Sequence, residues 1–422
     1  MTIHAPRGVE DILPRDALLY QWIEREASSL FSLYGYEEIR IPIFEKAELF
    51  LHSLGEETDV GKQMYIFKDK KGRRLCLRPE ATAPVIRAYL QHKLYRELKK
   101  WKVYYMGSMF RYERPQAGRS REFRQIGIEA IGEENPHLDV EVIEMGYQFL
   151  KRVKLSNFHL HLNSIGCRKC RPLYEEKLRD YLGKNINSLC TTCQRRYRYN
   201  ILRVLDCKNE RCQPVIKGAP RIEKYLCQNC QAHFNEVKKE LNALGIEFRL
   251  NPHLVRGLDY YTRTIFEFTS TLLGGQDTLC AGGRYDELIE ELGGPSIPAM
   301  GFAIGVERIL IALSKQGEGI PSKSPSLIYI ATIGRESWRI GYQLANLLRS
   351  KGIKAQLSLS ERSLSSQLKF ANKRRIRWVI ILGDEEIKKR KVILKDMNSG
   401  SQQELGWEEL EKFDEEFRSL KN

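Results

Sequence analysis

The spacing of apolar residues in the first part of the chain predicts both helix and sheet. Apolar residues at helical intervals follow the turn at Pro14 and predict an amphipathic helix over residues 16–33. Two later stretches, 101–111 and 123–132, are rich in strand-forming residues, and an arginine-rich loop separates them. This pattern predicts two strands joined as a hairpin with a long tip.

The C-terminal part of the chain alternates between short apolar stretches and helical patterns. Residues 315–326 precede it and have the composition of a linker. The alternating stretches are 327–333, 336–350, 353–359, 362–375 and 378–382. Strands interleaved with helices in this way predict a small α/β domain with a largely parallel sheet. The acidic residues at 408–416 are expected to form an exposed helix face.

The middle of the chain has a different composition, because residues 167–246 are basic and rich in cysteine. Strand-like sequence rich in glycine resumes at 254–285, so 167–246 is predicted to be a module inserted into one domain. A chain of 422 residues is too long for one ordinary core. The predicted divisions are a core domain in two parts, the inserted module and a C-terminal domain, with boundaries at 1–166, 167–246, 247–320 and 325–422.

Eight of the ten cysteines lie in the inserted module as four close pairs. The pairs are Cys167 with Cys170, Cys190 with Cys193, Cys207 with Cys212, and Cys227 with Cys230. Four such pairs supply the ligands that two tetrahedral zinc sites need. Packed free thiols are the alternative interpretation. His233 follows the last pair closely, and we expect it on the surface of a helix.

Positive charge is concentrated in two segments of the chain. The formal net charge is +15; residues 167–250 contain 18 lysines and arginines against 9 acidic residues, and residues 321–422 contain 20 against 13. The remaining residues are close to neutral. Basic appendages on a neutral body favour a polyanionic partner such as a nucleic acid. Improved solubility is the alternative explanation.

The chain shows no signal for a membrane. No apolar run approaches the roughly 20 residues that span a bilayer, and the first residues lack the apolar core of a signal peptide. We therefore expect a cytoplasmic protein without a membrane partner. In that compartment cysteines are thiols or metal ligands, not disulfides.

Residues with chemical potential gather around the predicted hairpin. In the strand over 124–132, alternate residues share a face, so Gln125, Gly127 and Glu129 form a polar floor for a small ligand. An ordinary solvated strand face is the alternative. The preceding loop is unusually basic, and guanidinium groups bind phosphate oxygens in pairs. Its arginines are Arg111, Arg114, Arg119, Arg121 and Arg124.

Four further segments combine close backbone approach with hydrogen-bonding side chains. They are 77–82, where Pro79 stiffens the backbone; 254–264, with an arginine, a glycine and two tyrosines; 281–286; and 299–310. The last is predicted to be a loop that enters an amphipathic helix, with Gly301, Gly305 and Arg308 on one helical face. A helix that tolerates glycine for packing is the alternative.

Together these segments resemble the motifs of class II aminoacyl-tRNA synthetases. Residues 34–45 are similar to the first motif, with a strand that ends at Ile41 and Pro42, and residues 110–131 and 301–308 are similar to the second and third. Two further segments, 254–262 and 281–286, resemble the histidine-specific motifs of the histidyl-tRNA synthetase family. The resemblance extends over nearly the whole chain in the family's order.

The resemblance implies a multidomain protein of mixed α/β and α+β class. Its parts are an antiparallel class II sheet core flanked by helices, the cysteine-rich insertion, and a C-terminal α/β anticodon-binding domain. The implied activity is histidine–tRNA ligation through a histidyl-adenylate, with L-histidine, ATP, Mg²⁺ and the histidine tRNA, by a cytoplasmic homodimer. The inserted module would clamp the acceptor arm of the tRNA. The family does not depend on zinc, so the resemblance does not imply that metal.

At the histidine end, the resemblance implies that Glu80, Thr82 and Gln125 hold the α-ammonium group. The family commonly has glycine where this chain has Ala81, and the added methyl group is expected to tighten the amine site.

The imidazole ring would be bound by Glu129 and Tyr261, which take its two nitrogen atoms. Tyr260 and Tyr285 would line the same pocket. A pocket of this kind rejects isosteres that lack an N–H donor, so hydrolytic editing is not expected.

At the phosphate end, the resemblance implies two catalytic arginines. Arg111 would contact the carboxylate and the ATP α-phosphate, and Arg256 would bridge these two anions where other class II enzymes tend to use a metal ion. Arg119 and Arg121 would bind the outer phosphates, and Arg308 would stack on adenine or reach the γ-phosphate. Fixed cations suit this step, because two anions must approach each other.

Two other classes of protein share part of this pattern. A non-catalytic paralogue that senses histidine and regulates ATP phosphoribosyltransferase would be expected to lack the motif with Arg256 and the C-terminal domain. A zinc-ribbon RNA-binding protein would explain the cysteines and the charge. It would not explain the ordered arginine and tyrosine motifs of the neutral body.

Overall fold

The computed structural model describes residues 3–54, 58–274, 277–317, 327–359, 362–407 and 409. Contacts divide the chain into two compact units, 1–320 and 321–422, and each unit is described by itself. The predicted linker at 315–326 and the acidic residues at 408–416 lie mostly outside the described residues. Within the described part, no helix has the length and apolar character needed to cross a membrane.

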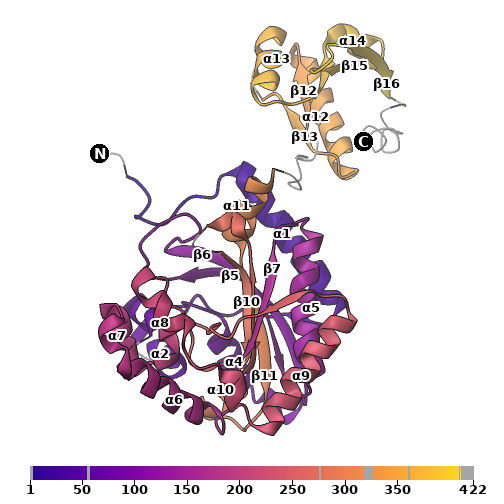
Figure 1. The fold of residues 1–422 in the computed structure, drawn as a ribbon. Helices are drawn as coiled ribbons and strands as arrows, with labels where there is room; N and C mark the ends of the chain where they lie inside the picture. The colour runs from indigo at the N-terminus through magenta and orange to yellow at the C-terminus, as the bar shows by residue number, and fades with distance from the viewer. Residues whose placement is uncertain are drawn as a thin grey trace. The chain divides into compact units, whose positions relative to one another are not determined.

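The first unit is built on a mixed sheet of eight strands, which Figure 1 shows at its centre. In spatial order these are β1 (Glu37–Glu38), β5 (Trp101–Phe110), β6 (Glu122–Ile131), β11 (Ala299–Gly305), β10 (Thr278–Arg284), β9 (Thr262–Thr269), β7 (His159–Ser164) and β8 (Phe248–Leu250). The inner strands pair antiparallel, while β1 and β8 pair parallel at the two edges. The predicted hairpin is confirmed as β5 and β6, and the antiparallel core expected of the fold is present.

Helices cover both faces of this sheet and bury its alternating apolar residues. One apolar core includes α1 (Pro14–Leu33), α5 (Pro136–Arg152), α9 (Gln228–Ala243) and α11 (Val306–Gln316). The other core includes α2 (Ala47–Leu54), α4 (Thr82–Gln91), α10 (Leu288–Glu291) and helices of the inserted module. The predicted helix over 16–33 is confirmed as α1, which begins at a proline that suits the first helical turn.

A small second sheet lies beside α2 and has the order β2 (Phe44–Lys46), β4 (Arg74–Leu77) and β3 (Ile66–Lys68), with α3 (Asp59–Lys62) nearby. The strand predicted to end at Ile41 and Pro42 is shorter than expected, because β1 contains only two residues. The guanidinium group of Arg78 explains this difference: its Nη1 donates a hydrogen bond of 2.7 Å to the carbonyl oxygen of Ile41. Proline also lacks the N–H group that a strand ladder needs.

Residues 167–246 form helices and short turns without a strand among the elements described. The helices are α6 (Arg171–Lys184), α7 (Thr191–Tyr199), α8 (Gln213–Lys217) and α9, and the short 3₁₀ turns are η2 (Ile186–Ser188), η3 (Ile201–Val204), η4 (Glu210–Cys212) and η5 (Ile222–Tyr225). Two more 3₁₀ turns lie elsewhere in the first unit, η1 (Leu94–Arg96) and η6 (Thr271–Leu273). The surface position expected for His233 is wrong. Its ring is buried, and Nε2 lies 3.0 Å from a carboxylate oxygen of Asp139 on α5.

The segment 299–310 also differs from its prediction. Gly301 and Gly305 lie on strand β11, not on a helix, and only Arg308 lies in α11. Both periods place the two glycines on one face, so the sequence pattern could not separate them. The strand is favoured because β11 pairs on both sides, with β6 and β10, and is buried at the centre of the sheet.

The second unit contains a five-stranded sheet in the order β13 (Ala355–Leu357), β12 (Ile328–Thr332), β14 (Trp378–Leu382), β15 (Lys391–Asp396) and β16 (Gln402–Gly406). Its helices are α12 (Arg335–Ser350), α13 (Leu364–Lys373) and α14 (Asp384–Lys388). The first three strands of the sheet pair parallel, as predicted, and β15 and β16 extend it antiparallel. The α/β class expected for this unit is confirmed.

Candidate active site

Most of the predicted site residues line one cavity of about 170 Å³ in the first unit. Its wall includes residues of β6, β10 and β11, the start of α4 and the start of α11. Ten of the thirteen residues for which the family resemblance implies a place in the site line it: Glu80, Thr82, Arg111, Arg119, Gln125, Arg256, Tyr260, Tyr261, Tyr285 and Arg308. The structure therefore brings together side chains that are more than two hundred residues apart in the chain.

The floor of the cavity is the strand face predicted from alternation. Gln125 and Glu129 share a face of β6, and the facing positions on β11 are the small residues Gly305 and Gly301. A Cβ atom at Gly301 would overlap the carboxylate of Glu129 and the carbonyl oxygen of Ile128. A glycine is required here because the carboxylate occupies the space of a side chain.

Carboxylates and hydroxyl groups form a connected network at one end of the cavity. The hydroxyl of Thr82 donates to Glu129 over 2.7 Å, and the hydroxyl of Tyr285 donates to its other oxygen. Glu80 accepts hydrogen bonds from the backbone N–H groups of Thr82 at 2.6 Å and Ala83 at 3.0 Å. Glu80 therefore caps the N-terminus of α4, where a negative charge is favourable.

Burial changes the acidity of this end of the cavity. It raises the pKa of Glu129 to about 8, although hydrogen bonds from Thr82 and Tyr285 oppose the shift. It also raises the pKa of Glu80 above its ordinary value, against the two backbone hydrogen bonds. Burial raises the pKa of Tyr261 to about 12, while the nearby cation of Arg256 acts in the opposite direction. Buried carboxylates with raised pKa values would be stabilised in their charged form by a cationic ligand group.

Two arginines at the other end are held by neutral groups. The Nε of Arg111 donates to the carbonyl oxygen of Pro79 over 2.9 Å. The Nε and Nη1 of Arg308 donate to the carbonyl oxygens of Gly118 and Thr278 over 3.1 and 3.0 Å. Burial lowers the pKa of both arginines; the neighbouring Arg119 contributes in the same direction, whereas the carboxylate of Glu113 opposes the shift. Carbonyl dipoles fix these guanidinium groups without neutralising them, so their charge is available to an anion.

Arg256 also lines the cavity and is half-buried. Its Nη1 lies 3.4 Å from a carboxylate oxygen of Glu267 on β9. Burial lowers its pKa, but Glu267 acts in the opposite direction, and together with Tyr261 and Asp206 it makes the net shift upward. The buried Nε of Arg256 and Oε1 of Gln125 have no hydrogen-bond partner among the described residues. Unpaired buried polar atoms that face a cavity indicate a ligand that would complete them.

Three predicted site residues do not line the cavity. Glu129 lies beneath its surface, where its two carboxylate oxygens accept hydrogen bonds from Thr82 and Tyr285. The guanidinium of Arg121 lies 3.9 Å from the ring centre of Tyr112, and its Nε donates to the Glu113 carbonyl oxygen over 3.3 Å.

The methyl group of Ala81 was expected to face the amine site, but it points elsewhere. It packs into an apolar cluster with Val85, Val103, Tyr105 and Met109. Its φ of −115° is accessible to any residue, so alanine introduces no backbone strain at this position.

Several cavity residues were not predicted from the sequence. Tyr105 reaches the floor from β5, and its hydroxyl occupies the space above Gly127. Glu113 lines the cavity and pairs with Arg119 at 3.2 Å, and Glu267 pairs with Arg256. The glycine at 127 was a usable signal for a close neighbour, whereas the acidic partners had no local signal.

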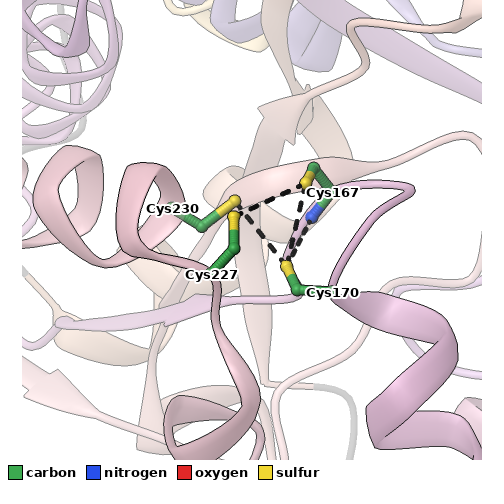
Figure 2. A group of neighbouring side chains, drawn as sticks. All are labelled: Cys167, Cys170, Cys227 and Cys230. Atoms are coloured by element: carbon green, nitrogen blue, oxygen red, sulfur yellow. Dashed lines mark hydrogen bonds between the residues drawn. The ribbon is translucent and has the colours of Figure 1, made fainter.

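The eight module cysteines form two separate groups of four sulfur atoms. The first tetrad is Cys167, Cys170, Cys227 and Cys230, which Figure 2 shows converging from two chain segments. The second tetrad is Cys190, Cys193, Cys207 and Cys212. Within each tetrad, all sulfur atoms lie within 4.8 Å of one another. Both groups have the composition of a tetrathiolate metal site.

Comparison with known sequences identifies the same regions. Residues 8–309 match the histidyl-tRNA synthetase family, and residues 328–416 match the anticodon binding domain family. The histidine–tRNA ligase of Halothermothrix orenii is 48% identical over 406 residues, which cover 96% of this chain and 97% of that protein. The histidine–tRNA ligase of Thermotoga maritima is 47% identical over 400 residues, covering 94% and 95%.

Solved structures show the same fold over the full length. The apo histidyl-tRNA synthetase of S. aureus has a TM-score of 0.82 and 37% identity, covering 98% of this chain and 99% of that one. A protein from Bacillus halodurans described as an ATP phosphoribosyltransferase regulatory subunit/histidyl-tRNA synthetase has a TM-score of 0.67 at 23% identity, which shows the fold alone. Sequence matches and structural likeness therefore agree: the chain belongs to the histidyl-tRNA synthetase family.

Proposed function

We propose that this chain activates L-histidine with ATP and transfers it to the histidine tRNA. The observation that carries the proposal is a single cavity with carboxylates and tyrosines at one end and a cluster of guanidinium groups, in excess of the carboxylates beside them, at the other. An amino acid has a cationic ammonium and an anionic carboxylate, and ATP adds further anions. The cavity matches this order of charges.

The histidine end of the cavity fits a small cationic heterocycle. We propose that Glu80, Thr82 and Gln125 bind the α-ammonium group, whose positive charge suits the buried carboxylate and the unpaired amide oxygen. Glu129 and Tyr261 would bind the two imidazole nitrogens; for Glu129, which does not line the cavity, this requires Thr82 or Tyr285 to move aside. An analogue without these N–H groups would leave buried polar atoms unpaired, which disfavours its binding strongly.

Tyr260 and Tyr285 complete this pocket as apolar walls with polar tips. The ring centres of the two tyrosines lie 5.7 Å apart in an edge-to-face arrangement, which fixes both rings. A rigid wall keeps the shape of the pocket before the ligand arrives.

At the phosphate end, the carboxylate of histidine would attack the α-phosphorus of ATP and release pyrophosphate. Arg111 and Arg256 would neutralise the two anions that meet in this step. We propose that Arg119 and Arg121 bind the outer phosphates and that Arg308 covers adenine or the γ-phosphate. For Arg121 this requires a change from its present position over Tyr112.

ATP is expected to enter with Mg²⁺, which supplies positive charge to its outer phosphates. Glu113 lines the cavity beside Arg119 and offers carboxylate oxygens, the type of ligand that Mg²⁺ prefers. The four-sulfur groups of the inserted module are proposed to bind structural zinc.

The tRNA would contact the basic parts of the chain. The match to the anticodon binding domain family supports placing the anticodon on the second unit. The inserted module, with 18 basic against 9 acidic residues over 167–250, would clamp the acceptor arm through its phosphates. In this proposal, residues 1–166 and 247–320 form the catalytic domain, residues 167–246 bind the acceptor arm, and residues 325–422 bind the anticodon.

A second copy of this chain is proposed to dock on the small sheet. Large apolar side chains on and beside β2 and β3 are 43–55% exposed: Ile43, Phe44, Ile66 and Phe67. Clustered exposed apolar residues favour a protein interface. We propose that the homodimer works in the cytoplasm, where histidine, ATP and tRNA meet.

Histidine-dependent exchange of pyrophosphate into ATP tests the activation step without tRNA. We expect exchange with histidine and none with other amino acids. A histidine-sensing regulatory protein would bind histidine and show no exchange. The alternative is less supported, because Arg256 and the C-terminal unit are both present.

A further inference from the structure

The sulfur atoms of the two tetrads have the spacing of ligands around one ion. A tetrahedral zinc site with bonds of about 2.3 Å places neighbouring sulfur atoms about 3.8 Å apart. In the first tetrad, the Sγ of Cys167 lies 3.8 Å from that of Cys170 and 3.9 Å from that of Cys227, and Cys170 lies 3.8 Å from Cys230. These distances are far longer than a disulfide bond of about 2.05 Å.

Backbone N–H groups donate hydrogen bonds to three of the sulfur atoms. The backbone N–H of Cys167 donates to the Sγ of Cys170 over 3.2 Å, and that of Cys190 donates to the Sγ of Cys212 over 3.2 Å. Cys207 accepts a third such bond, from the N–H of Asn209 over 3.4 Å. Donors aimed at sulfur stabilise negative charge and orient the ligands of a metal. Packing of neutral thiols explains burial but not this arrangement.

The first tetrad is joined by hydrogen bonds to the backbone at Tyr261 and Arg263. Gly166, next to Cys167, accepts a backbone hydrogen bond of 2.8 Å from Arg263, and Ile165 donates one of 2.8 Å to the carbonyl of Arg263. Arg171, next to Cys170, donates to the carbonyl oxygen of Tyr261. The backbone that presents Tyr261 is therefore held by residues adjacent to two of the four cysteines.

The second tetrad is joined to the same segment through residues that lie between its cysteines in the chain. The turn between Cys193 and Cys207 contains Asn200, whose amide donates to the carboxylate of Asp259. Arg203 of this turn lies against Gly257, its Nη1 being 3.6 Å from the position of an added Cβ. Both contacts reach residues that flank the cavity, within three positions of Arg256.

We propose that each tetrad binds one Zn²⁺ ion and that the two ions together hold residues 256–263 in position for histidine activation. Arg171, Asn200 and Arg203 act as positioning residues, since they connect the cysteine loops to the segment without lining the cavity. The metals have no chemical step of their own. The activity part of this inference rests on the proposed function, whereas the metal part does not.

Metal content tests the first half of the proposal. Elemental analysis of protein purified without chelators is expected to give two zinc ions per chain, Cys227→Ser and Cys190→Ser one each, and the control Cys76→Ala two. Protein reconstituted with Co²⁺ is expected to show the intense visible absorption of tetrahedral thiolate ligation. Wild-type protein without bound zinc and without this cobalt spectrum would overturn the metal sites, whatever its activity.

The second half predicts a coupling between metal and activity. Asn200→Ala is expected to keep both zinc ions and to lower the rate of histidine-dependent exchange about 10- to 100-fold, with the KM for ATP unchanged. Asn242→Ala, an exposed asparagine of the same module, is the matched control and is expected to match wild type. Full exchange by Asn200→Ala and by chelator-treated, still folded protein would overturn the coupling. A wild-type protein with two zinc ions but no exchange would instead refute the proposed function.

Discussion

Replacing Arg256 by alanine removes a half-buried cation that lines the cavity and lies 3.4 Å from the carboxylate of Glu267. Two unit charges about 4 Å apart interact by about 4 kcal/mol at the effective dielectric constant of about 20 that suits protein sites. If Arg256 stabilises the approach of the two anions, its loss costs about this amount in the transition state. Since about 1.4 kcal/mol corresponds to a factor of ten, the exchange rate is expected to fall about 10³-fold.

Histidine-dependent pyrophosphate exchange measures the loss, and calorimetric titration with ATP separates it from nucleotide binding, which we expect to change little. Removing one partner of an ion pair that is largely shielded from water also destabilises a fold, by at most roughly 3–5 kcal/mol. The double variant Arg256→Ala with Glu267→Gln removes the unpaired carboxylate and is expected to recover stability but not activity. Arg249→Ala, on an exposed position of β8, serves as the control. Near-normal exchange by folded Arg256→Ala protein would refute this account of the activation step.

Three further changes test the floor of the cavity. Burial raises the pKa of Glu129 from 4.5 to about 8, so the folded chain binds its proton more tightly than the unfolded chain and stability falls as pH rises between these values. The stability of the wild type should fall by an amount on the order of 4 kcal/mol between pH 5 and pH 8, and Glu129→Gln should lack this fall. Melting temperatures at the two pH values measure it, and an equal change with pH in the wild type and the variant would contradict the reasoning. Gly301→Ala should destabilise the chain by about 1–3 kcal/mol and abolish exchange, whereas Gly305→Ala, whose Cβ would meet Arg308 atoms no closer than 3.6 Å, should be tolerated. Ala81→Gly should cost about 1 kcal/mol of stability in thermal unfolding and leave the KM for histidine unchanged, because the methyl group packs away from the cavity.

Local periodicity was enough to predict the elements that build the floor. Alternation over 124–132 predicted which side chains of β6 face the core, and Ile126 and Ile128 are indeed buried there. The helix α1 and the alternating elements of the second unit followed from the same reasoning. The segment 299–310 was misassigned because residues four positions apart share a face in both a helix and a strand, and pairing with β6 and β10 decides between them.

Partners from distant parts of the chain could not be predicted. His233 looked like a surface residue because its acceptor, Asp139, lies 94 residues away. The contact of Asn200 with Asp259 has the same character. A single sequence contains the residue types of such pairs but no record of which ones meet. The four cysteine pairs, likewise, gave the ligand chemistry without saying which pairs combine.

Because carbonyl groups of the backbone hold Arg111 and Arg308, the cost of placing these two charges is met during folding and not during ligand binding. Backbone dipoles in a fold are already oriented, whereas water molecules must turn to face each new charge. The repulsion between neighbouring guanidinium groups is therefore already present in the folded protein without a ligand, and it destabilises that state. A bound polyphosphate would cancel that repulsion. Part of the free energy of nucleotide binding would therefore come from relief of a strain that lowers the stability of the unliganded protein.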